Sequence, residues 1–393
     1  MDSALQHIAD QVRGASASGT ALRIRGGGSK DFYGRSLQGE LLDTRPLAGI
    51  TSYEPSELVV TVRAGTPLAE LEAALAEEGQ CLPFEPPHFS INPAAASAAT
   101  VGGMVAAGLS GPARASAGGV RDYMLGVQLL NGRAEQLTFG GQVMKNVAGY
   151  DVSRLMAGSM GTLGVITDVS LKVLPVAPAE ATLVFELDQA SALAQLHRWG
   201  AQPLPLNASC WVHDDTPQAD AAADKNGGGR DLLFVRLRGA VAAVEAACQK
   251  MLQAVPGTRM DNAMAAPDWQ ACRDLRLPFF TTPPAPGMLL WRLSVAQTAP
   301  SLGLPWPQLI EWHGGLRWLW APQDAAAQVH EAAAQARGSA SIFIAAQVMD
   351  TGACGLFDAQ PVVKTPLDGI HRRLKAEFDP AGVFNRGRLF ADM

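Results

Sequence analysis

The sequence predicts a mixed α+β fold divided into two or three structural units. Three observations support this prediction. A chain of 393 residues exceeds the size of one ordinary hydrophobic core. Short β-branched runs alternate with amphipathic helical stretches along the whole chain. A proline-marked segment, PVAPAE at 175–180, indicates a boundary between the first unit and the second.

A strand and a helix are the clearest elements of the first unit. LVVTVRAG, residues 58–65, predicts a strand because β-branched side chains favour extended backbone. A helix is predicted at 66–79. Thr66 can accept from the free N–H groups of its first turn, Pro67 has a φ angle preset for the first helical position, and Gly79 can take the left-handed position at its end.

Two strand pairs are predicted between this helix and the boundary. Residues 123–140 predict two strands about the turn Asn131-Gly132, a dipeptide that favours tight hairpins. Residues 163–175, LGVITDVSLKVLP, predict the second pair, which ends at the proline boundary.

The second unit also alternates strands and helices. Its polar, glycine-rich segment 214–231 predicts a mobile surface loop between a strand near Trp211 and the next strand. Apolar periodicity predicts further strands at 232–239, 287–295 and 341–348, helices at 241–255 and 323–338, and a terminal helix followed by a turn at Asp379-Pro380.

Composition excludes several classes of protein. Nearly half of the residues are apolar and 17% are charged, which is typical of a folded globular chain. The net charge of −6, without a basic block, argues against nucleic acid as a partner. The first residues lack the basic start and apolar stretch of a secretory signal. The most apolar window, 94–109, is too rich in glycine and alanine for a transmembrane segment.

The cysteines indicate a reducing compartment. There are five, they are scattered, and they form no C-x-x-C pair. We therefore expect a soluble cytoplasmic protein with free thiols, no iron–sulfur cluster or zinc ribbon in this chain, and no metal site.

The stretch ALRIRGGGSKDFYGR, residues 21–35, places three consecutive glycines after a short strand. It matches neither the Walker A loop nor the G-x-G-x-x-G fingerprint, which would require a glycine at Asp31. Consecutive glycines can still direct several backbone N–H groups at one anion. The stretch therefore indicates either a phosphate-binding loop or a plain turn.

A second region, 86–122, has almost no bulky side chain between Pro93 and Met104 and few after it. A core of such residues would bury little apolar area. The region is either a tight packing seam or the wall of a channel for a large flat ligand. Two glycine-rich stretches together with this channel favour a ligand of dinucleotide size.

Five motifs carry a resemblance to a known family, namely RGGGSK, TVGGMVAAGLSGP, GGVRDYMLG, KNVAGYDVSRLMAGSMGTLGVIT and DPAGVFNRGRL. With them the chain resembles the FAD-linked oxidases of the vanillyl-alcohol oxidase and p-cresol methylhydroxylase (VAO/PCMH) type. More narrowly, it is similar along its whole length to FAD-binding subunits of bacterial glycolate oxidase (glycolate dehydrogenase).

The resemblance implies a two-part FAD-binding domain and an α+β cap domain. The FAD-binding domain would span 1–175, with lobes 1–52 and 53–175, and the cap 176–365. The segment 366–393 would return to the FAD-binding domain.

The resemblance also implies which residues contact FAD. They are Gly26, Gly27, Gly28 and Ser29 at the pyrophosphate; Pro87 and His88 near the isoalloxazine; Thr100, Val101, Gly102 and Gly103 along the ribityl chain and flavin; Ser110 and Gly111 on the same wall; Gly118, Gly119 and Asp122 on the adenosine side; and Ser159, Gly161, Gly164 and Ile166 around the adenine and pyrophosphate.

The sequence departs from the family pattern at the points that concern chemistry. Relatives with a tethered flavin carry histidine where Ser29 stands, so we expect non-covalent FAD. The cap stretch 338–355 contains no histidine, whereas relatives that oxidise hydroxy acids are histidine-rich there. The catalytic residues stay unknown, with His88, Asn385 and Arg388 as weak candidates; His88 could equally hydrogen-bond backbone.

The implied function is that of an FAD-binding subunit in a complex that oxidises glycolate or a similar small 2-hydroxy acid. Its partners would be a larger FAD subunit and an iron–sulfur subunit, through which it could lie at the inner membrane. The alternatives are a largely non-catalytic FAD-containing scaffold and a stand-alone oxidase. The aromatic and cationic residues of the cap favour an interface; they are Trp291, Arg292, Arg317, Trp318 and Trp320.

Overall fold

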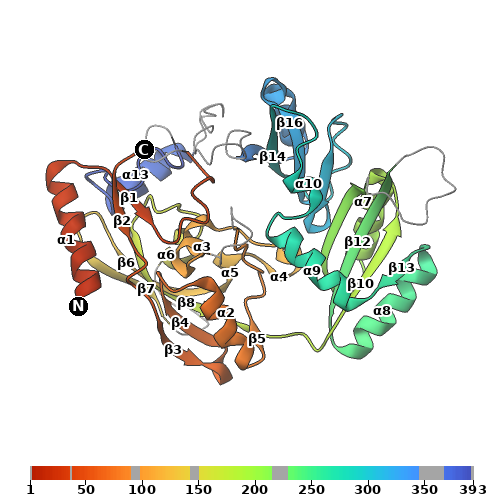
Figure 1. The fold of residues 1–393 in the computed structure, drawn as a ribbon, viewed down its shortest axis with the longest axis horizontal. Helices are drawn as coiled ribbons and strands as arrows, with labels where there is room; N and C mark the ends of the chain where they lie inside the picture. Colours follow the sequence, from red (N-terminus) through yellow and green to blue (C-terminus); the bar gives the residue numbers. More distant parts are fainter. Residues whose placement is uncertain are drawn as a thin grey trace. The chain divides into compact units, whose positions relative to one another are not determined.

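The computed structural model describes residues 2–35, 38–89, 98–141, 150–214, 229–344 and 367–390, and they form two compact units (Figure 1). Unit 1 combines the described residues of 1–110, 119–176 and 351–393. Unit 2 combines 111–118 with the described residues of 177–350. The short segment 111–118, which we assigned to the FAD-binding domain, thus packs with unit 2.

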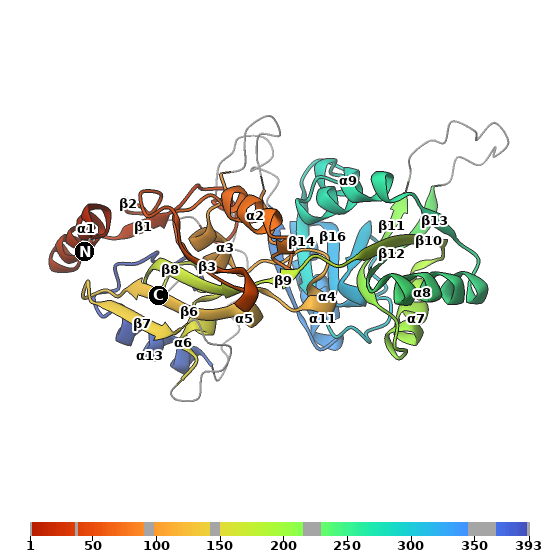
Figure 2. The ribbon, with the colours of Figure 1, turned by 90° about the horizontal axis from the view of Figure 1, so that it is seen from below.

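The larger lobe of unit 1 is built on an antiparallel sheet of order β3-β4-β8-β6-β7 (Figure 2). Leu71 and Leu75 share one buried core with Val60, Val127 and Val169 of the sheet. The elements of this lobe are β3 (Ile50–Glu54), β4 (Val59–Arg63), α2 (Leu68–Glu77), β5 (Gln80–Cys81), α3 (Val101–Ala107), α5 (Val120–Tyr123), β6 (Met124–Leu130), β7 (Gln136–Gly140), α6 (Val152–Met156), β8 (Val165–Lys172) and β9 (Leu174–Pro175).

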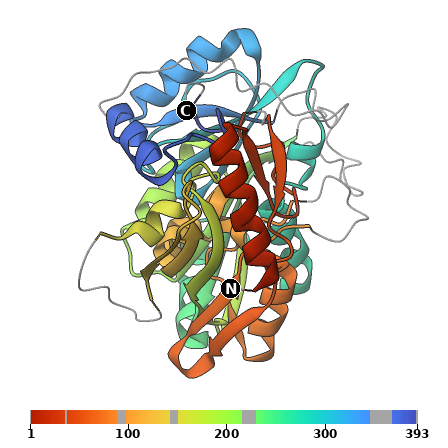
Figure 3. The ribbon, with the colours of Figure 1, turned by 90° about the vertical axis from the view of Figure 1, so that its left-hand side faces the viewer.

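The smaller lobe joins the two ends of the chain. Helix α1 (Ser3–Ser18), which faces the reader in Figure 3, packs near the parallel strands β1 (Leu22–Arg25) and β2 (Glu40–Asp43). The end of the chain runs beside β1, because Leu22 donates to the carbonyl of Val383 at 2.8 Å and accepts from the amide of Asn385 at 3.0 Å. This confirms the predicted return of the C-terminal segment.

A buried ion pair fixes the turn after α13 (Asp368–Phe378). Lys375 Nζ lies 2.7 Å from the carboxylate of Asp379, which also accepts from the amides of Val383 and Phe384. Burial lowers the pKa of Lys375, and the neighbouring Asp379 opposes that shift. The Asp379-Pro380 turn is therefore a charged anchor within unit 1.

Unit 2 is built on an antiparallel sheet of order β13-β10-β12-β11-β15-β16-β14-β17. Helices α7 and α8 cover one face and α9 the other (Figure 2). The elements are α4 (Arg114–Ala117), β10 (Ala179–Glu186), α7 (Gln189–Gly200), β11 (Leu206–Asp214), β12 (Arg230–Gly239), α8 (Val241–Ala254), β13 (Thr258–Met260), α9 (Asn262–Arg273), α10 (Pro278–Thr281), β14 (Met288–Ser294), β15 (Gln308–Glu311), β16 (Leu316–Pro322), α11 (Ala326–Gln335) and β17 (Ser339–Ile344).

Most predicted elements are present, but three local predictions are wrong. Thr66 does not cap α2, because its hydroxyl bonds to the backbone of Gly49. The turn at Asn131 spans five residues, since the Asn131 side chain accepts from the amides of Arg133 and Glu135. Residues 163–175 form one long strand, β8, and a two-residue bridge. The predicted loop within 214–231 lies largely outside the described residues.

The interface expected from the cap aromatics is also corrected. Trp291 and Arg317 have no exposed surface, and Trp318 and Trp320 are at most 4% exposed. The Arg317 guanidinium bonds to the carbonyls of Gly314 and Ala299. These side chains are the interior of unit 2, with Arg292 the one that stays half-exposed among the five.

Candidate functional site

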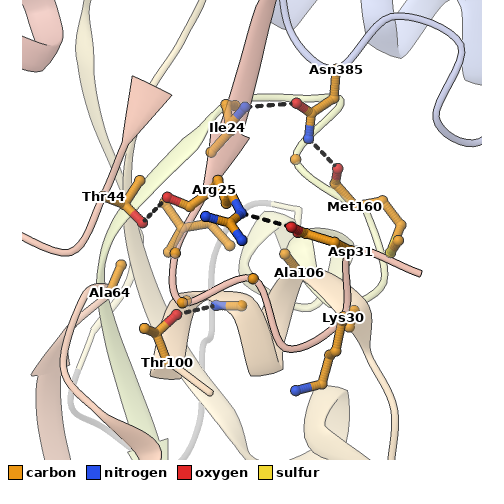
Figure 4. A pocket seen from close by; sticks show the side chains of 18 of the residues that line it. Ile24, Arg25, Lys30, Asp31, Thr44, Ala64, Thr100, Ala106, Met160 and Asn385 are labelled. Carbon is orange, nitrogen blue, oxygen red and sulfur yellow. Dashed lines mark hydrogen bonds and ion pairs between the residues drawn. The ribbon is translucent and has the colours of Figure 1, made fainter. Parts of the chain in front are cut away.

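A cleft in unit 1 contains the glycine stretch of residues 26–28 (Figure 4). Its cavity volume is about 110 Å³, and the cleft is open to solvent. Its walls come from the segment 23–31, from α3, from the 160–166 segment and from the end of the chain. The lining residues are mainly glycine, alanine and polar residues, so much of the wall is backbone.

The glycines are required by close approach of backbone to backbone. A Cβ atom on Gly27 would lie 1.4 Å from the carbonyl oxygen of Ala98, and one on Gly26 would lie 2.3 Å from Thr100 Oγ1. Gly28 has a φ of +78°, which larger residues rarely adopt. The glycine stretch therefore follows the opposite wall closely, and its own side of the cleft carries no side chains.

Cationic side chains border the glycines. Arg25 Nε lies 2.7 Å from the Asp31 carboxylate, which closes the glycine turn upon itself. Lys30 and Arg388 also line the cleft. The cleft thus combines bare backbone with positive charge, a combination that suits an anionic group.

The end of the chain fastens this loop. Asn385 accepts from the amide of Ile24 at 2.8 Å and donates to the carbonyl of Met160 at 2.7 Å, as the dashed lines in Figure 4 show. Arg388 donates to the carbonyls of Arg35 and Lys30. Both side chains therefore hold the segments that line the cleft, through hydrogen bonds to backbone atoms.

Comparison with known proteins places this cleft in a family. A family model described as an FAD binding domain matches residues 4–140. Glycolate oxidase subunit GlcE of Escherichia coli (strain K12) is 41% identical over 388 residues, covering 99% of this chain and 98% of that protein. The chain belongs to the GlcE family. Glycolate oxidase subunit GlcD of Bacillus subtilis (strain 168) is 30% identical over 146 residues, 37% of this chain and 30% of that one.

Solved structures agree on the fold. A 4-ethylphenol oxidase from Gulosibacter chungangensis superposes with a TM-score of 0.68 at 14% identity, covering 99% of this chain and 88% of that chain. An alkyldihydroxyacetonephosphate synthase gives 0.64 at 16% identity, over 97% and 75%. These confirm the VAO/PCMH-type fold. The family model and the similarity to GlcE confirm FAD as the cofactor.

The cleft brings together twelve of the residues singled out from the sequence. They are Gly26, Gly27, Gly28, Ser29, Thr100, Gly102, Gly103, Gly161, Gly164, Ile166, Asn385 and Arg388. The sequence analysis missed other lining residues, among them Arg25, Thr44, Ala64, Ala106 and Met160. Arg25 directly precedes the glycines, so its position was a usable signal; the others come from elements whose proximity only the fold reveals.

Other predicted contacts do not line this cleft. The Val101 side chain is buried in the core of unit 1, and Asp122 accepts from the amide of Gly119 at the start of α5. Pro87, Ser110 and Ser159 also lie in unit 1, whereas Gly111 and Gly118 belong to unit 2. Their contacts with FAD stay predictions.

His88, the histidine favoured by motif, is engaged with a carboxylate. Its Nε2 lies 2.8 Å from Glu72 Oε2 on α2, and the His88 side chain is 12% exposed. Neither residue lines the cleft. His88 therefore forms a histidine–glutamate pair next to Phe89, whose ring contacts Phe32.

The cleft fits FAD by a simple steric criterion. Side chains are missing where a diphosphate would need access to amides, at Gly26, Gly27 and Gly28, and a Cβ there would collide with the opposite wall or strain the backbone. Arg25, Lys30 and Arg388 supply positive charge at the same place. None of the helices in the described parts of the chain is long and apolar enough to span a membrane.

Proposed function

We propose that this chain is the FAD-binding subunit of a complex that oxidises glycolate or a similar small 2-hydroxy acid. The observation that carries the proposal is the glycine-lined cleft in a chain that is similar to GlcE over its whole length. Bound FAD would supply an acceptor for the hydride of the hydroxy acid. The glycine stretch would hold the cofactor, and Arg25, Lys30 and Arg388 would balance its negative charge.

Partners complete the proposal. A larger FAD subunit similar to GlcD and an iron–sulfur subunit would carry electrons onward, with the complex in the cytoplasm or at the inner membrane. The scaffold alternative is favoured by one specific observation. The described residues that line the cleft include no histidine, cysteine, glutamate or tyrosine, and Asp31 is paired with Arg25, so Lys30 is the one other described lining residue of a type that serves as a general base.

The state of the flavin tests both candidates. Purified protein should show a flavin spectrum, and acid precipitation should release the flavin into the supernatant because Ser29 provides no tethering ring nitrogen. Anaerobic glycolate added to the chain alone should leave the flavin oxidised, and added to the reconstituted complex should bleach it. A flavin that is never reduced in the complex would support the scaffold, and protein without flavin would refute the proposed function.

A further inference from the structure

A strained turn in unit 2 presents a tryptophan to two arginines. Trp312 and His313 both have a φ of 54°, between β15 and β16. Bulky residues adopt this conformation at a cost of about 1–3 kcal/mol each, and such residues cluster at functional sites. The Trp312 indole is fixed by a 3.0 Å bond to the carbonyl of Gly111, and the His313 amide by Ser209 Oγ at 3.0 Å.

Two guanidinium groups lie on this indole. Arg114 of α4 lies 4.7 Å from the centre of the Trp312 ring, and Arg292 of β14 lies 5.3 Å from it. Arg292 is also the cross-strand neighbour of Trp318, whose ring centre is 6.0 Å away. Stacking fixes the plane of the Arg292 guanidinium without using its N–H donors.

Arg292 differs from the structural arginines of the same unit. Arg236 also stacks on a tryptophan, Trp269, but is 2% exposed and donates to Asn207 Oδ1 at 2.7 Å. Arg317 is fully buried and bonded to carbonyls. Arg292, by contrast, has neither a hydrogen bond nor an ion pair with any residue that the structure describes, and its nitrogen atoms are not sealed from solvent. Packing alone does not explain why the Arg292 guanidinium is held in one orientation without a hydrogen-bond acceptor among the described residues.

The residues beside Trp312 do not pair with Arg292. The carboxylate of Glu311, the acid next to Trp312 in sequence, is bonded to Trp318 Nε1 at 2.7 Å and to Cys272 Sγ at 3.3 Å. His313 adds no third charge, because burial lowers its pKa to about 4. Its Nε2 lies 3.1 Å from Ser116 Oγ, and its Nδ1 is buried without a partner among the described residues.

We propose that Arg292 and Arg114, oriented by Trp312, form a binding site for a small carboxylate within unit 2. Arg292 would bind the carboxylate through two parallel N–H bonds, the geometry that a guanidinium fork favours, and Arg114 would add charge. The identification of that carboxylate as a 2-hydroxy acid rests on the proposed function. The site itself rests on the arginines, the rings and the strained turn.

Equilibrium dialysis of the full chain against radiolabelled glycolate tests the site. Wild type should bind saturably, and the neutral analogue glycolamide should not compete, because it lacks the carboxylate. Arg292→Gln should weaken binding at least about tenfold, the loss expected for a charge-assisted bond. Arg114→Gln, at an exposed position, should also weaken it. Arg259→Gln, which removes an exposed arginine of the same unit paired with Glu245, should leave binding unchanged.

Three results would overturn the site: no saturable binding by wild type, equal competition by glycolamide, or binding that survives in both Arg292→Gln and Arg114→Gln. If Arg292→Gln fails to fold, Arg114→Gln and the glycolamide competition still decide the matter. The flavin content of the same samples separates this inference from the proposed function. Flavin-containing protein that binds no glycolate refutes the site alone, whereas flavin-free protein with arginine-dependent binding refutes the function alone.

Discussion

The two units use opposite means to build their interiors. The cleft of unit 1 is lined mainly by glycine, alanine and polar or charged residues, and much of its wall is backbone. Unit 2 holds all eight tryptophans of the chain, and all four tyrosines lie in unit 1. Small side chains bury little apolar area, so a wall made of them gains stability from a ligand; tryptophans supply that area themselves. The comparison predicts that the cleft of unit 1 gains stability from the ligand that it binds, whereas the interior of unit 2 is stabilised by its own packing.

Gly27→Val should have the largest effect on FAD binding, because it tests the bare wall directly. The new side chain would meet the carbonyl of Ala98, whose oxygen would be 1.4 Å from Cβ. We expect FAD affinity to fall at least about 100-fold, or ~2.7 kcal/mol, measured as flavin absorbance per protein and by titration of apoprotein.

The matched control is Gly14→Ala in α1, where an added Cβ has nothing within 4 Å. It should keep full flavin content and stabilise the helix by about 0.5–1 kcal/mol. Wild-type flavin content in Gly27→Val would show that the glycines do not form the cofactor wall.

Asp379→Asn tests the rigid part of unit 1. It leaves Lys375 buried without its carboxylate and weakens the acceptor of the Val383 and Phe384 amides. Breaking a buried pair in this way costs about 3–5 kcal/mol. Hydrogen exchange of peptides from α13 and β1 should accelerate correspondingly. Asp10→Asn, at an exposed pair with Arg13, should change the exchange rates little. Equal effects of the two variants on exchange would contradict the role of Asp379 as a buried anchor.

Acid should weaken unit 2 through His313. Burial lowers its pKa to about 4, while an unfolded histidine titrates near ~6.5. Between these values the unfolded chain binds a proton that the native ring does not, so stability falls as pH falls from about 6.5 to about 4, by ~3 kcal/mol. Because every tryptophan lies in unit 2, tryptophan fluorescence during denaturation monitors that unit.

His313→Asn is the suitable variant, since asparagine tolerates the left-handed backbone. It should reduce the pH dependence without abolishing it, because burial also lowers the pKa of His330. His7→Asn, in α1 of unit 1, should leave the tryptophan signal unaltered. An unchanged slope in His313→Asn would contradict the assignment.

The two units also differ in how far their sequences predicted them. Glycines at 26–28 indicate a bare wall because no other residue leaves the backbone so open, and periodic Leu68, Leu71 and Leu75 indicate a buried helix face. The sequences did not predict which residues become neighbours in the folded chain. That Lys375 would bond to the carbonyl of Thr162, or that 111–118 would pack with unit 2, depends on contacts between residues distant in sequence, which no local pattern encodes.

The same limit explains the errors at the site. Thr66 has the sequence of a cap, yet Gly49 takes its hydroxyl because the fold places that backbone beside it. The cap tryptophans have the composition of an interface, but the sheet of unit 2 encloses them. Motif resemblance found Asn385, whose partners Ile24 and Met160 are separated from it by more than 200 residues and were not predictable from spacing.

Thr100→Ala should have the smallest effect on stability. It tests whether the wall of the unit 1 cleft depends on the bound flavin. Thr100 lines the cleft, and its hydroxyl accepts from the amide of Gly103 at 3.3 Å at the start of α3. Loss of this cap costs about 1 kcal/mol, and Thr100→Ser should restore it. Without flavin, exchange in α3 should accelerate in the alanine variant. With saturating flavin the difference should shrink if the cofactor holds this wall, since the ligand then supplies the stability that the small residues do not. If the exchange rates of the alanine variant and wild type differ equally with and without flavin, the wall of the unit 1 cleft is stable without a ligand, as the interior of unit 2 is.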